Sequence, residues 1–497
     1  MNLNWLIVLP VVSALAILPF SQLKQVRSIA AIGATLQLLL SCVLLYVFMQ
    51  DPASSMSGSM AFESSYAWYK PLHIYHSVGV DGISIAMIML TAIVVLAGVL
   101  ISWNMEKMSR EFFFLLMLLS AGAYGYFIST DVFTMFFFLE LAVVPKFLLI
   151  GIWGSGKKEY SATKLVLMLM GASALVFIGL AGLYFNNASG NLSFNMSELA
   201  ANPLSVEQQK FFFPFAFIGF GVFTALFPFH TWVPDGHSSA PTAASMFLAG
   251  ISMKLGGYGI LRVATTIMPE AAHYYSPYII VLSAIAILYS SFATMMQTDL
   301  KYINAYSSVS HTGFVLFGIG MLTKTAIAGA VIQMVSHGLM TALFFAVIGM
   351  VYERTHTRMV DKMGGLLKTI PFISTVFMIA GLTSLGLPGF SGFVAEMMVF
   401  IGSWENGGTL HRVATIAATA SIVVTAVYIL RAIGKVIMGP VEHEAYFEFK
   451  DARWNEKTAA IILVAAILVI GITPFLINHL ITPGTEAIMG KINPLSP

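Results

Sequence analysis

The stretch FFFLELAVVPKFLLIGIWG, from Phe136 to Gly154, is long and apolar enough to cross a bilayer as a helix. It nevertheless carries two opposite charges, Glu140 and Lys146, with Pro145 between them. A charged side chain at the centre of a membrane helix costs about 2.5–3.5 kcal/mol on insertion scales. Such residues mark an ion or proton path by default, and the alternative is a structural pair that joins neighbouring helices.

The composition of the whole chain indicates a polytopic membrane protein. Its 497 residues are 58% hydrophobic and 10% charged, whereas soluble proteins contain about 25% charged residues. The single cysteine, Cys42, excludes an internal disulfide, a cysteine-based zinc site and a cysteine-bound iron–sulfur cluster. Neither a phosphate-binding loop of the Walker type nor a dinucleotide-binding glycine motif is present. We therefore expect no cofactor in this chain, and nothing in the sequence points to nucleic acid.

Apolar windows of about 20 residues mark transmembrane helices. The first window lacks a basic n-region and a small-residue cleavage site, so we interpret it as a retained helix rather than a signal peptide. The sequence predicts fourteen spans, at residues 3–19, 28–49, 79–102, 112–129, 132–153, 162–184, 211–230, 242–266, 276–296, 302–320, 325–351, 371–400, 411–437 and 458–478.

The distribution of lysine and arginine predicts the orientation. Of the 25 basic residues, 17 fall in one set of loops, 6 in the other set and two, Lys146 and Lys254, inside spans. Because cytoplasmic loops carry the excess of basic residues, we expect the first set in the cytoplasm and both termini on the outer face. The polar and aromatic stretch 51–78 is then an interfacial loop on the outer side. The charged segment 442–454 is cytoplasmic, either solvated or docked on a neighbouring subunit.

Proline and glycine interrupt two of the predicted spans. Span seven runs into FPFHTWVPDGHSSAP, which contains Pro228 and His230, and span twelve contains SLGLPGFSGF, with Pro388 and Gly389. Such breaks are tolerated in a membrane only where they pack against protein or line a wet cavity. The breaks lie five spans apart, so equivalent helices run in opposite directions, which is typical of an inverted repeat. We expect an all-α polytopic fold with two inverted five-helix repeats, spans 4–8 and 9–13.

The position of the breaks also divides the chain into four parts. We expect helices 1–3 with an outer loop at residues 1–110, the first repeat at 111–268 and the second repeat at 269–440. A cytoplasmic loop, helix 14 and a C-terminal tail fill residues 441–497. Because the two halves show little residue-level similarity, this division depends on the place and chemistry of the breaks.

Four further ionisable residues lie inside predicted spans. Lys254 stands near the middle of span eight, where a desolvated lysine can exchange a proton whereas an arginine cannot. His311 in span ten and His337 in span eleven titrate near neutral pH, and their serine and threonine neighbours suggest a hydrated relay. Glu396 follows the break in span twelve, where a carboxylate can meet water and release a proton. The alternatives are histidines that only pack and a glutamate that is solvated at the outer interface.

These residues stand in motifs that resemble the antiporter-like membrane subunits of respiratory complex I. Sister subunits of the L and N types carry lysine in span twelve, whereas M-type subunits carry glutamate, so Glu396 favours the M type. The motifs extend from about residue 120 to residue 400. They are FFFLELAVVP, FPFHTWVPDGHSSAPTAAS, ISMKLGGYGILR, AYSSVSHTGF, QMVSHGLMTALFF, TRMVDKMGGL and GLPGFSGFVAEMMVF.

The resemblance implies a role for each matched residue. Glu140 would belong to an input half-channel, Lys254 would be the central lysine, and Glu396 would be the terminal exit acid. His311 and His337 would be the relay positions between them. The implied activity is proton pumping driven by quinone reduction elsewhere in the complex. A related multisubunit cation/proton antiporter or membrane-bound hydrogenase complex is the alternative.

The resemblance also implies the cofactors and partners. NADH or another donor, FMN, iron–sulfur clusters and quinone would be bound by partner subunits, and this chain would hold no redox centre. Its partners would be the other membrane subunits of complex I, with sister antiporter-like subunits on its flanks, and the lipid bilayer. The implied location is the inner (cytoplasmic) membrane of a bacterial cell.

The chain departs from the family pattern in two linked positions. The family has a lysine in span seven, five residues before the proline of its Pro-Leu-His motif, where this chain has Phe223. It usually has a small or apolar residue after the span-five proline, where this chain has Lys146. Compared with the resembling family, the sequence therefore predicts that Lys146 replaces the span-seven lysine beside Glu140.

A solute transporter that binds its substrate at the two helix breaks is an interpretation from a different class. It requires a cavity of about 300 Å³ or more near the middle of the membrane. A continuous narrow row of polar side chains would argue against it.

Overall fold

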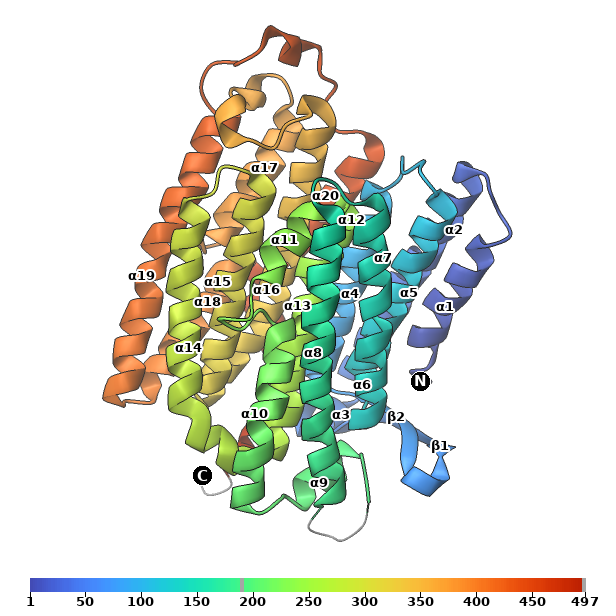
Figure 1. Cartoon of the computed structure of the whole chain (residues 1–497), viewed down its shortest axis with the longest axis vertical. Coiled ribbons are helices and arrows are strands. Elements are labelled where there is room, and N and C mark those ends of the chain that lie inside the picture. Colours follow the sequence, from blue (N-terminus) through green and yellow to red (C-terminus); the bar gives the residue numbers. More distant parts are fainter. Residues whose placement is uncertain (188–191, 494–497) are drawn as a thin grey trace.

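Long helices run side by side along the long axis of the molecule (Figure 1). The computed structural model describes residues 1–187 and 192–493. Within these residues, ten helical segments are long and apolar enough to cross a membrane. They are α2 (Leu23–Gln50), α4 (Gly82–Ile101), α5 (Ser109–Ile128), α6–α7 (Val132–Trp153), α8 (Lys158–Phe185), Thr242–Thr265, α14 (Pro269–Met295), α16 (Lys324–Thr355), Thr409–Ile437 and α20 (Trp454–Ile472).

The other four predicted spans coincide with helices that are shorter or more polar. Length and hydropathy alone therefore support ten of the fourteen spans, and the count of fourteen stays a prediction. The predicted polytopic, almost entirely helical fold is confirmed. The four helical elements are α1 (Trp5–Ile17), α10 (Val206–Phe223), α15 (Leu300–Gly320) and the pair α17 (Pro371–Ser384) and α18 (Ser391–Glu405).

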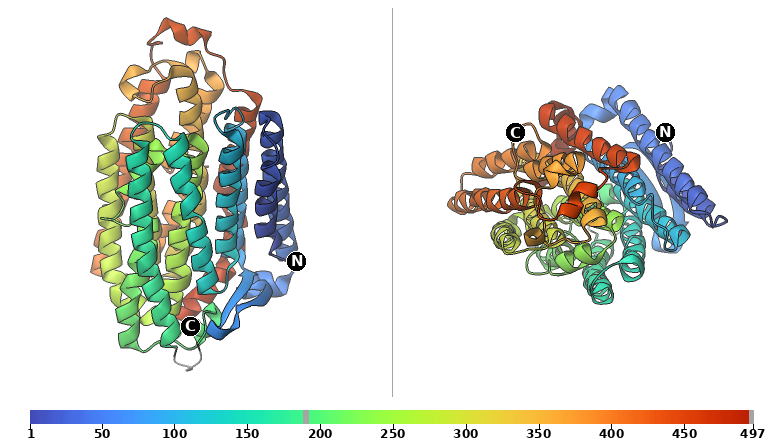
Figure 2. Two further views of the ribbon diagram at one scale, coloured as in Figure 1. Left: turned by 45° about the vertical axis from the view of Figure 1, so that its right-hand side comes forward. Right: turned by 90° about the horizontal axis from the view of Figure 1, so that it is seen from above.

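Loops and short elements gather at two opposite ends of the bundle (Figures 1 and 2). We call the end with residues 354–370 and 438–453 the basic end. The opposite, hairpin end carries strands β1 (Ala61–Tyr69) and β2 (Ile74–Val80), helix α9 (Met196–Ala201) and the C-terminal part of the chain. The N-terminal segment also reaches this end, because Asn4 Oδ1 lies 2.7 Å from His76 Nε2 on β2. The four-part division of the chain stays a prediction.

The stretch predicted to be an interfacial loop is instead an ordered β-hairpin. After the short helix α3 (Pro52–Ser57), β1 and β2 pair antiparallel in a register that aligns Ala61 with Val80. Pairing satisfies the backbone N–H and C=O groups of the exposed segment, while aromatic side chains such as Trp68 stay half exposed. The expected C-terminal tail is likewise a helix, α21 (Pro474–Ile492).

Both predicted helix breaks are present. Helix α10 ends at Phe223 and α11 (Trp232–Ser239) follows, so Pro228 and His230 lie between them. Helix α17 ends at Ser384 and α18 begins at Ser391, so Pro388 and Gly389 lie in the second break. The α10–α11 pair runs toward the basic end and the α17–α18 pair runs away from it (Figure 1). The opposite directions agree with the predicted inverted repeats.

Two helices form the centre of the bundle. The segment Thr242–Thr265 and helix α16 are buried along the whole of their most apolar windows. The first of these contains α12 (Thr242–Phe247), a π-helical turn, α13 (Met253–Gly259) and a second π-helical segment, Ile260–Thr265. A π-helical turn leaves some backbone carbonyls out of the regular ladder and is frequent at functional sites.

The charged segment 442–454 packs against its own chain at its C-terminal part. Arg354 at the end of α16 forms an ion pair with Glu456 at 2.8 Å. The Asp451 carboxylate accepts a hydrogen bond from the backbone N–H of Phe372, at the start of α17, at 2.7 Å. This part of the segment is therefore neither simply solvated nor left free for a neighbour.

Candidate functional site: a buried polar row

Four of the ionisable residues singled out in the sequence form one continuous row. Lys254 Nζ on α13 lies 2.9 Å from Nδ1 of His337 on α16. The His337 ring stacks on His311 of α15, with the ring centroids 5.3 Å apart and the planes inclined by 25°. His311 Nδ1 lies 3.5 Å from Oε1 of Glu396 on α18. All four residues are at most 5% exposed, so the row is shielded from bulk solvent.

A π-helical turn holds the lysine end of this row. Lys254 Nζ donates a hydrogen bond to the backbone carbonyl of Ala249 at 2.5 Å. Ala249 lies in the π-helical turn Leu248–Ser252, where the irregular backbone makes a carbonyl available. The lysine nitrogen is therefore shared between a fixed carbonyl and the His337 imidazole.

The imidazole of His311 offers two alternative hydrogen-bond patterns. Its Nε2 lies 3.1 Å from Ser384 Oγ, and its Nδ1 lies 3.2 Å from the Gln333 amide nitrogen. In the neutral ring with the proton on Nε2, Nδ1 accepts from Gln333. In the imidazolium ring, Nδ1 becomes a donor and faces the Glu396 carboxylate instead. A proton on His311 therefore changes the partner of Nδ1.

The break between α17 and α18 makes room for the carboxylate of Glu396. Gly386 in this break has φ +73°, a conformation that side chains with a Cβ rarely adopt. A Cβ at Gly386 would lie only 2.7 Å from Glu396 Oε2. Gly389, further along the break, has nothing within 4 Å of an added Cβ. The absence of a side chain at Gly386 thus leaves room for the carboxylate, whereas Gly389 does not contact the row.

Glu140 and Lys146 lie apart from each other in the first half of the molecule. The Glu140 carboxylate accepts a hydrogen bond from Ser173 on α8. The Lys146 side chain is buried, and its Nζ has no hydrogen-bond partner among the described residues. No ion pair within 4 Å joins the two side chains in the described part of the chain. The kink between α6 (Val132–Leu141) and α7 (Val143–Trp153) follows from Pro145, which cannot donate to the preceding turn.

Lys146 instead points at the residue that stands in place of the family lysine. Its Nζ lies 6.0 Å from the centre of the Phe223 ring, in the last turn of α10. The next residue, Thr224, packs so closely against α13 that a Cβ at Gly256 would collide with it. The end of α10 therefore contacts Lys146 on one side and the helix of Lys254 on the other.

His230 does not join the row. Its ring stacks on Phe227, with centroids 5.5 Å apart, and meets the edge of Tyr289 at 5.3 Å. The structure thus places His230 among aromatic packing partners in the first helix break.

Two buried residues near the row were missed by sequence reasoning. His237 on α11 is fully buried between Trp232 and Phe345, and neither of its ring nitrogens has a hydrogen-bond partner among the described residues. It interacts electrostatically with Lys254 and Lys301. Lys301, counted in the sequence as a loop residue, is 6% exposed and donates to the Ala240 carbonyl at 2.7 Å. These residues extend the polar row toward the basic end.

A polar cavity lies at the basic end beside this extension. It has a volume of about 600 Å³ and lies between α8, α11 and α15. Asp235 in its wall pairs with Lys164 at 2.8 Å and accepts from the Tyr302 hydroxyl at 3.2 Å. Ser239, which also lines the cavity, is adjacent to Ala240. The cavity is therefore in a position to bring water near Lys301.

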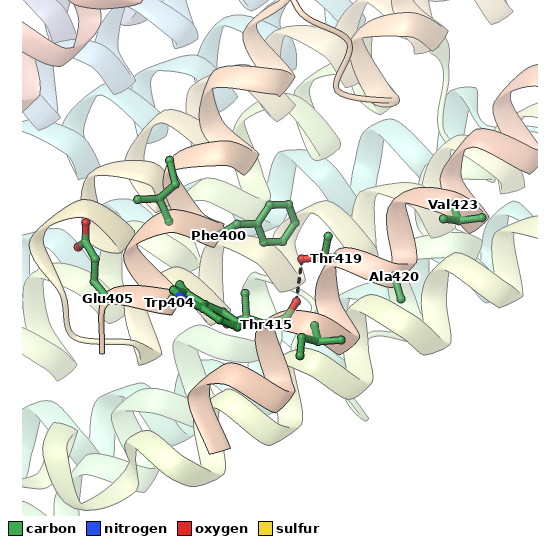
Figure 3. A pocket seen from close by; sticks show the side chains of 9 residues that line it. Phe400, Trp404, Glu405, Thr415, Thr419, Ala420 and Val423 are labelled. Atoms are coloured by element: carbon green, nitrogen blue, oxygen red, sulfur yellow. Dashed lines mark hydrogen bonds between the residues drawn. The ribbon is translucent and has the colours of Figure 1, made fainter. Parts of the chain in front are cut away.

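The larger groove, of about 650 Å³, is apolar and lies between α18 and α19 (Thr409–Ala432). Figure 3 shows Phe400 and Trp404 of α18 facing Thr415 and Thr419 of α19. None of the residues that line this groove or the polar cavity belongs to the row from Lys254 to Glu396. A further apolar cavity of about 440 Å³ borders Val335 and Leu339 of α16, but no residue of the row or of the two helix breaks lines it. Among the described residues, the ionisable groups form a narrow row of side chains, which argues against a solute site at the helix breaks.

Comparisons with known proteins agree with this arrangement. Residues 129–423 match the model of the family "NADH:quinone oxidoreductase/Mrp antiporter, TM". The chain is 36% identical to an NAD(P)H-quinone oxidoreductase chain 4 of Synechococcus sp. (strain JA-2-3B'a(2-13)), covering 99% of this chain and 93% of the relative. It is similar to a chain in respiratory complex I from Thermus thermophilus with bound NADH, with a TM-score of 0.89, 25% identity and 99% coverage of both chains. It shares its fold with a chain of the Mrp complex from Dietzia sp. DQ12-45-1b, with a TM-score of 0.83, 18% identity and coverage of 99% and 97%. The chain therefore belongs to the NADH:quinone oxidoreductase/Mrp antiporter family of membrane subunits.

Proposed function

We propose that this chain is the M-type proton-translocating membrane subunit of an NADH:quinone oxidoreductase. The observation that carries the proposal is the buried row Lys254–His337–His311–Glu396, in which neighbouring groups lie within proton-transfer reach or in ring contact. Each member can hold or release a proton, and histidine titrates nearest neutral pH. The glutamate at the end of the row matches the residue type that distinguishes M-type subunits from the lysine-bearing L and N types.

Protons enter from the basic end and leave beyond Glu396 in this account. The path begins at Glu140 and Lys146 in the interior of the α6–α7 segment, and the polar cavity beside Lys301 supplies a contact with water at the basic end. Lys254 passes the proton to Nδ1 of His337. Transfer from His337 to the stacked ring of His311 then requires a bridging water or a rotation of one ring, because no hydrogen bond joins the two imidazoles directly. Nδ1 of His311 delivers the proton to Glu396. Moving one proton outward costs about 2.3 kcal/mol per 100 mV. The subunit therefore needs an energy source outside this chain.

Partner subunits supply that energy. NADH or another donor, FMN, iron–sulfur clusters and quinone would be bound there, and quinone reduction would change the electric field along the row. Sister antiporter-like subunits would flank this chain in the membrane. By the positive-inside rule we expect the basic end in the cytoplasm and both termini on the outer face, and we infer that the membrane is the inner membrane of a bacterial cell.

A subunit of a multisubunit cation/proton antiporter is the second candidate, because an Mrp complex chain has the same fold. A membrane-bound hydrogenase complex belongs to the same alternative. Isolation of the native complex and identification of its partner subunits separates these candidates. Our proposal predicts co-purified NADH-oxidising and quinone-binding subunits, and sodium-independent acidification of vesicles driven by NADH. Sodium-dependent activity without NADH-linked quinone reduction would contradict it.

A further inference from the structure

A second series of hydrogen-bonded side chains leads from the hairpin end toward Lys254 in the first half of the molecule. Ser84 Oγ donates to Asp81 Oδ1 at 3.1 Å, and it also lies 2.8 Å from the Tyr258 hydroxyl. Asp81 is the N-cap of α4 and directly follows strand β2 of the hairpin. Tyr258 lies four residues after Lys254, which is about one helical turn, or about 6 Å along the axis. Carboxylate, hydroxyl and phenol are all groups that can pass a proton.

An arginine occupies the outer end of this series of side chains. Arg262, one further turn along the same helix, forms an ion pair with Asp81. Its guanidinium carbon also lies 5.2 Å from the centre of the Tyr258 ring, so the charge covers the phenol. Both charged side chains are buried, with exposures of 7% for Arg262 and 1% for Asp81. Arg262 is one of the six basic residues that the sequence analysis assigned to the outer side, at the end of the predicted span 242–266, whereas the structure buries its side chain.

Helix α21 seals the pair from the hairpin end. A Cβ at Gly484 of α21 would lie 2.9 Å from Asp81 Oδ2, so the helix backbone passes close to the carboxylate. Lys491, near the end of the same helix, interacts electrostatically with Asp81 and Arg262. One buried carboxylate therefore faces two positive charges, and the local excess of charge is positive.

We infer that the Arg262–Asp81 ion pair is a barrier that prevents protons from passing between Lys254 and the hairpin end within the first half. A guanidinium cannot release its proton in a protein, so it cannot take part in a relay. It also holds Asp81 as a carboxylate, and a fixed positive charge repels an approaching hydronium ion, as in other selective pores. With this exit closed, a proton on Lys254 reaches the outer side only through His337 and the second half. This inference rests on the proposed proton translocation and assigns Arg262 the task of directing it.

The alternative is an ion pair that only fixes α21 and α4 to the central helix. A buried arginine–aspartate pair is consistent with that structural task as well. The two accounts differ for Arg262→Lys, which retains an ion pair but introduces a group that can lose its proton. If the ion pair is only structural, Arg262→Lys should leave the proton permeability unchanged. If the ion pair is a barrier, Arg262→Lys should raise the proton permeability.

The test is the passive proton permeability of membrane vesicles that contain the assembled complex. An imposed pH gradient is followed with a pH-sensitive dye, without NADH, so the readout is independent of turnover. We expect the gradient to decay several-fold faster for Arg262→Gln, and faster than wild type for Arg262→Lys. The control Arg412→Gln removes an exposed arginine that lies over Trp404 on the far side of the molecule, and it should retain the wild-type rate.

A double variant connects the leak to the row. Lys254→Met with Arg262→Gln should restore slow decay, because the leak then lacks its inner proton carrier. If Arg262→Gln does not assemble, Arg262→Lys provides the decision. Wild-type decay rates in the assembled single variants of Arg262 would overturn the inference. NADH-driven acidification by the wild-type complex in the same vesicles tests the proposed function separately.

Discussion

Lys146 Nζ lies 6.0 Å from the centre of the Phe223 ring, although the two residues belong to different helices, α7 and α10. The buried ammonium thus occupies the neighbourhood from which a lysine at position 223 would start. What matters for a nearby carboxylate is the position of the nitrogen, because an opposite charge within about 4–6 Å favours the ionised form. The geometry agrees with an exchange of positions between the lysine and an apolar residue.

The first prediction tests whether Lys146 replaces a lysine at position 223. Lys146→Met should lose most NADH-driven proton pumping in the assembled complex, because the first half then lacks its ammonium. The double variant Lys146→Met with Phe223→Lys should recover a measurable part of pumping. Pumping is measured as vesicle acidification per NADH oxidised. Normal pumping in Lys146→Met alone would show that the buried lysine has no part in translocation.

The second prediction concerns the pocket of Glu396. Gly386→Ala should impair pumping more than Gly389→Ala, since only a Cβ at position 386 meets the Glu396 carboxylate. Both glycines have positive φ, at +73° and +94°, so both changes strain the backbone by about 1–2 kcal/mol. The second variant therefore controls for strain. Equal pumping in both, at equal amounts of assembled complex, would mean that the position of Glu396 is not critical.

The third prediction is the orientation of the two ends. Cysteines replacing Glu63 on β1 and Lys362 near the basic end, in a Cys42→Ser background, should react with a membrane-impermeant thiol reagent from opposite sides. Both positions are exposed in the structure. The position 362 cysteine should be labelled only in inside-out vesicles, because the basic end is expected in the cytoplasm. Labelling of both cysteines from one side would refute the arrangement of the two ends across the membrane.

The fourth prediction uses a buried carboxyl at the start of α6. Burial raises the pKa of Asp131, the N-cap residue outside the membrane span, to about 6. The folded chain then binds a proton more tightly than the unfolded chain. The contribution of Asp131 to the free energy of unfolding is therefore most favourable at acid pH and falls as the pH rises from about 4 to about 6. Two pKa units correspond to at most about 3 kcal/mol.

Asp131→Asn should remove this dependence, because asparagine keeps the N-cap acceptor without a charge. We expect a clearly higher thermal unfolding midpoint at pH 8 and a smaller increase at pH 4.5 in detergent, because only part of the cost is present at the lower pH. Asp361→Asn is the control, since the hydrogen bond from Lys435 holds the pKa of that exposed carboxyl below its usual range. That variant should not gain stability at pH 8. An Asp131→Asn protein without a gain at pH 8 would contradict the assigned cost of burying the charge.

Much of the row could be predicted because charged residues are costly in an apolar helix. Lys254, His311, His337 and Glu396 each stand out within a span, and helix breaks at proline and glycine were equally visible. Their order in space could not be predicted, because it depends on contacts between helices that are distant in the chain. The row connects α13 to α16, α16 to α15 and α15 to α18, so it follows the packing rather than the sequence.

Residues near span ends were harder to place. His237 stands in a proline-rich stretch that resembles a loop, and only the structure shows a short buried helix there. Lys301 stands between two predicted spans and Arg262 at the end of one, where basic residues are usually solvated. Both are buried, because Lys301 donates a hydrogen bond to a backbone carbonyl and Arg262 forms an ion pair with a carboxylate. The β-hairpin was missed for a different reason, since its exposed aromatic residues are equally typical of a membrane-surface loop.

The fifth prediction tests whether Lys254 transfers a proton or only contributes a charge. Its Nζ contacts His337 at 2.9 Å, so lysine is in a position to pass a proton into the imidazole pair. The decisive measurement is NADH-driven acidification of vesicles containing the assembled Lys254→Arg complex, with Lys254→Ala measured in parallel. We predict that both variants assemble but fail to pump, because arginine keeps the charge and cannot release its proton. Full pumping by Lys254→Arg would contradict the account, since Lys254 would then be a fixed charge and not a member of a proton path.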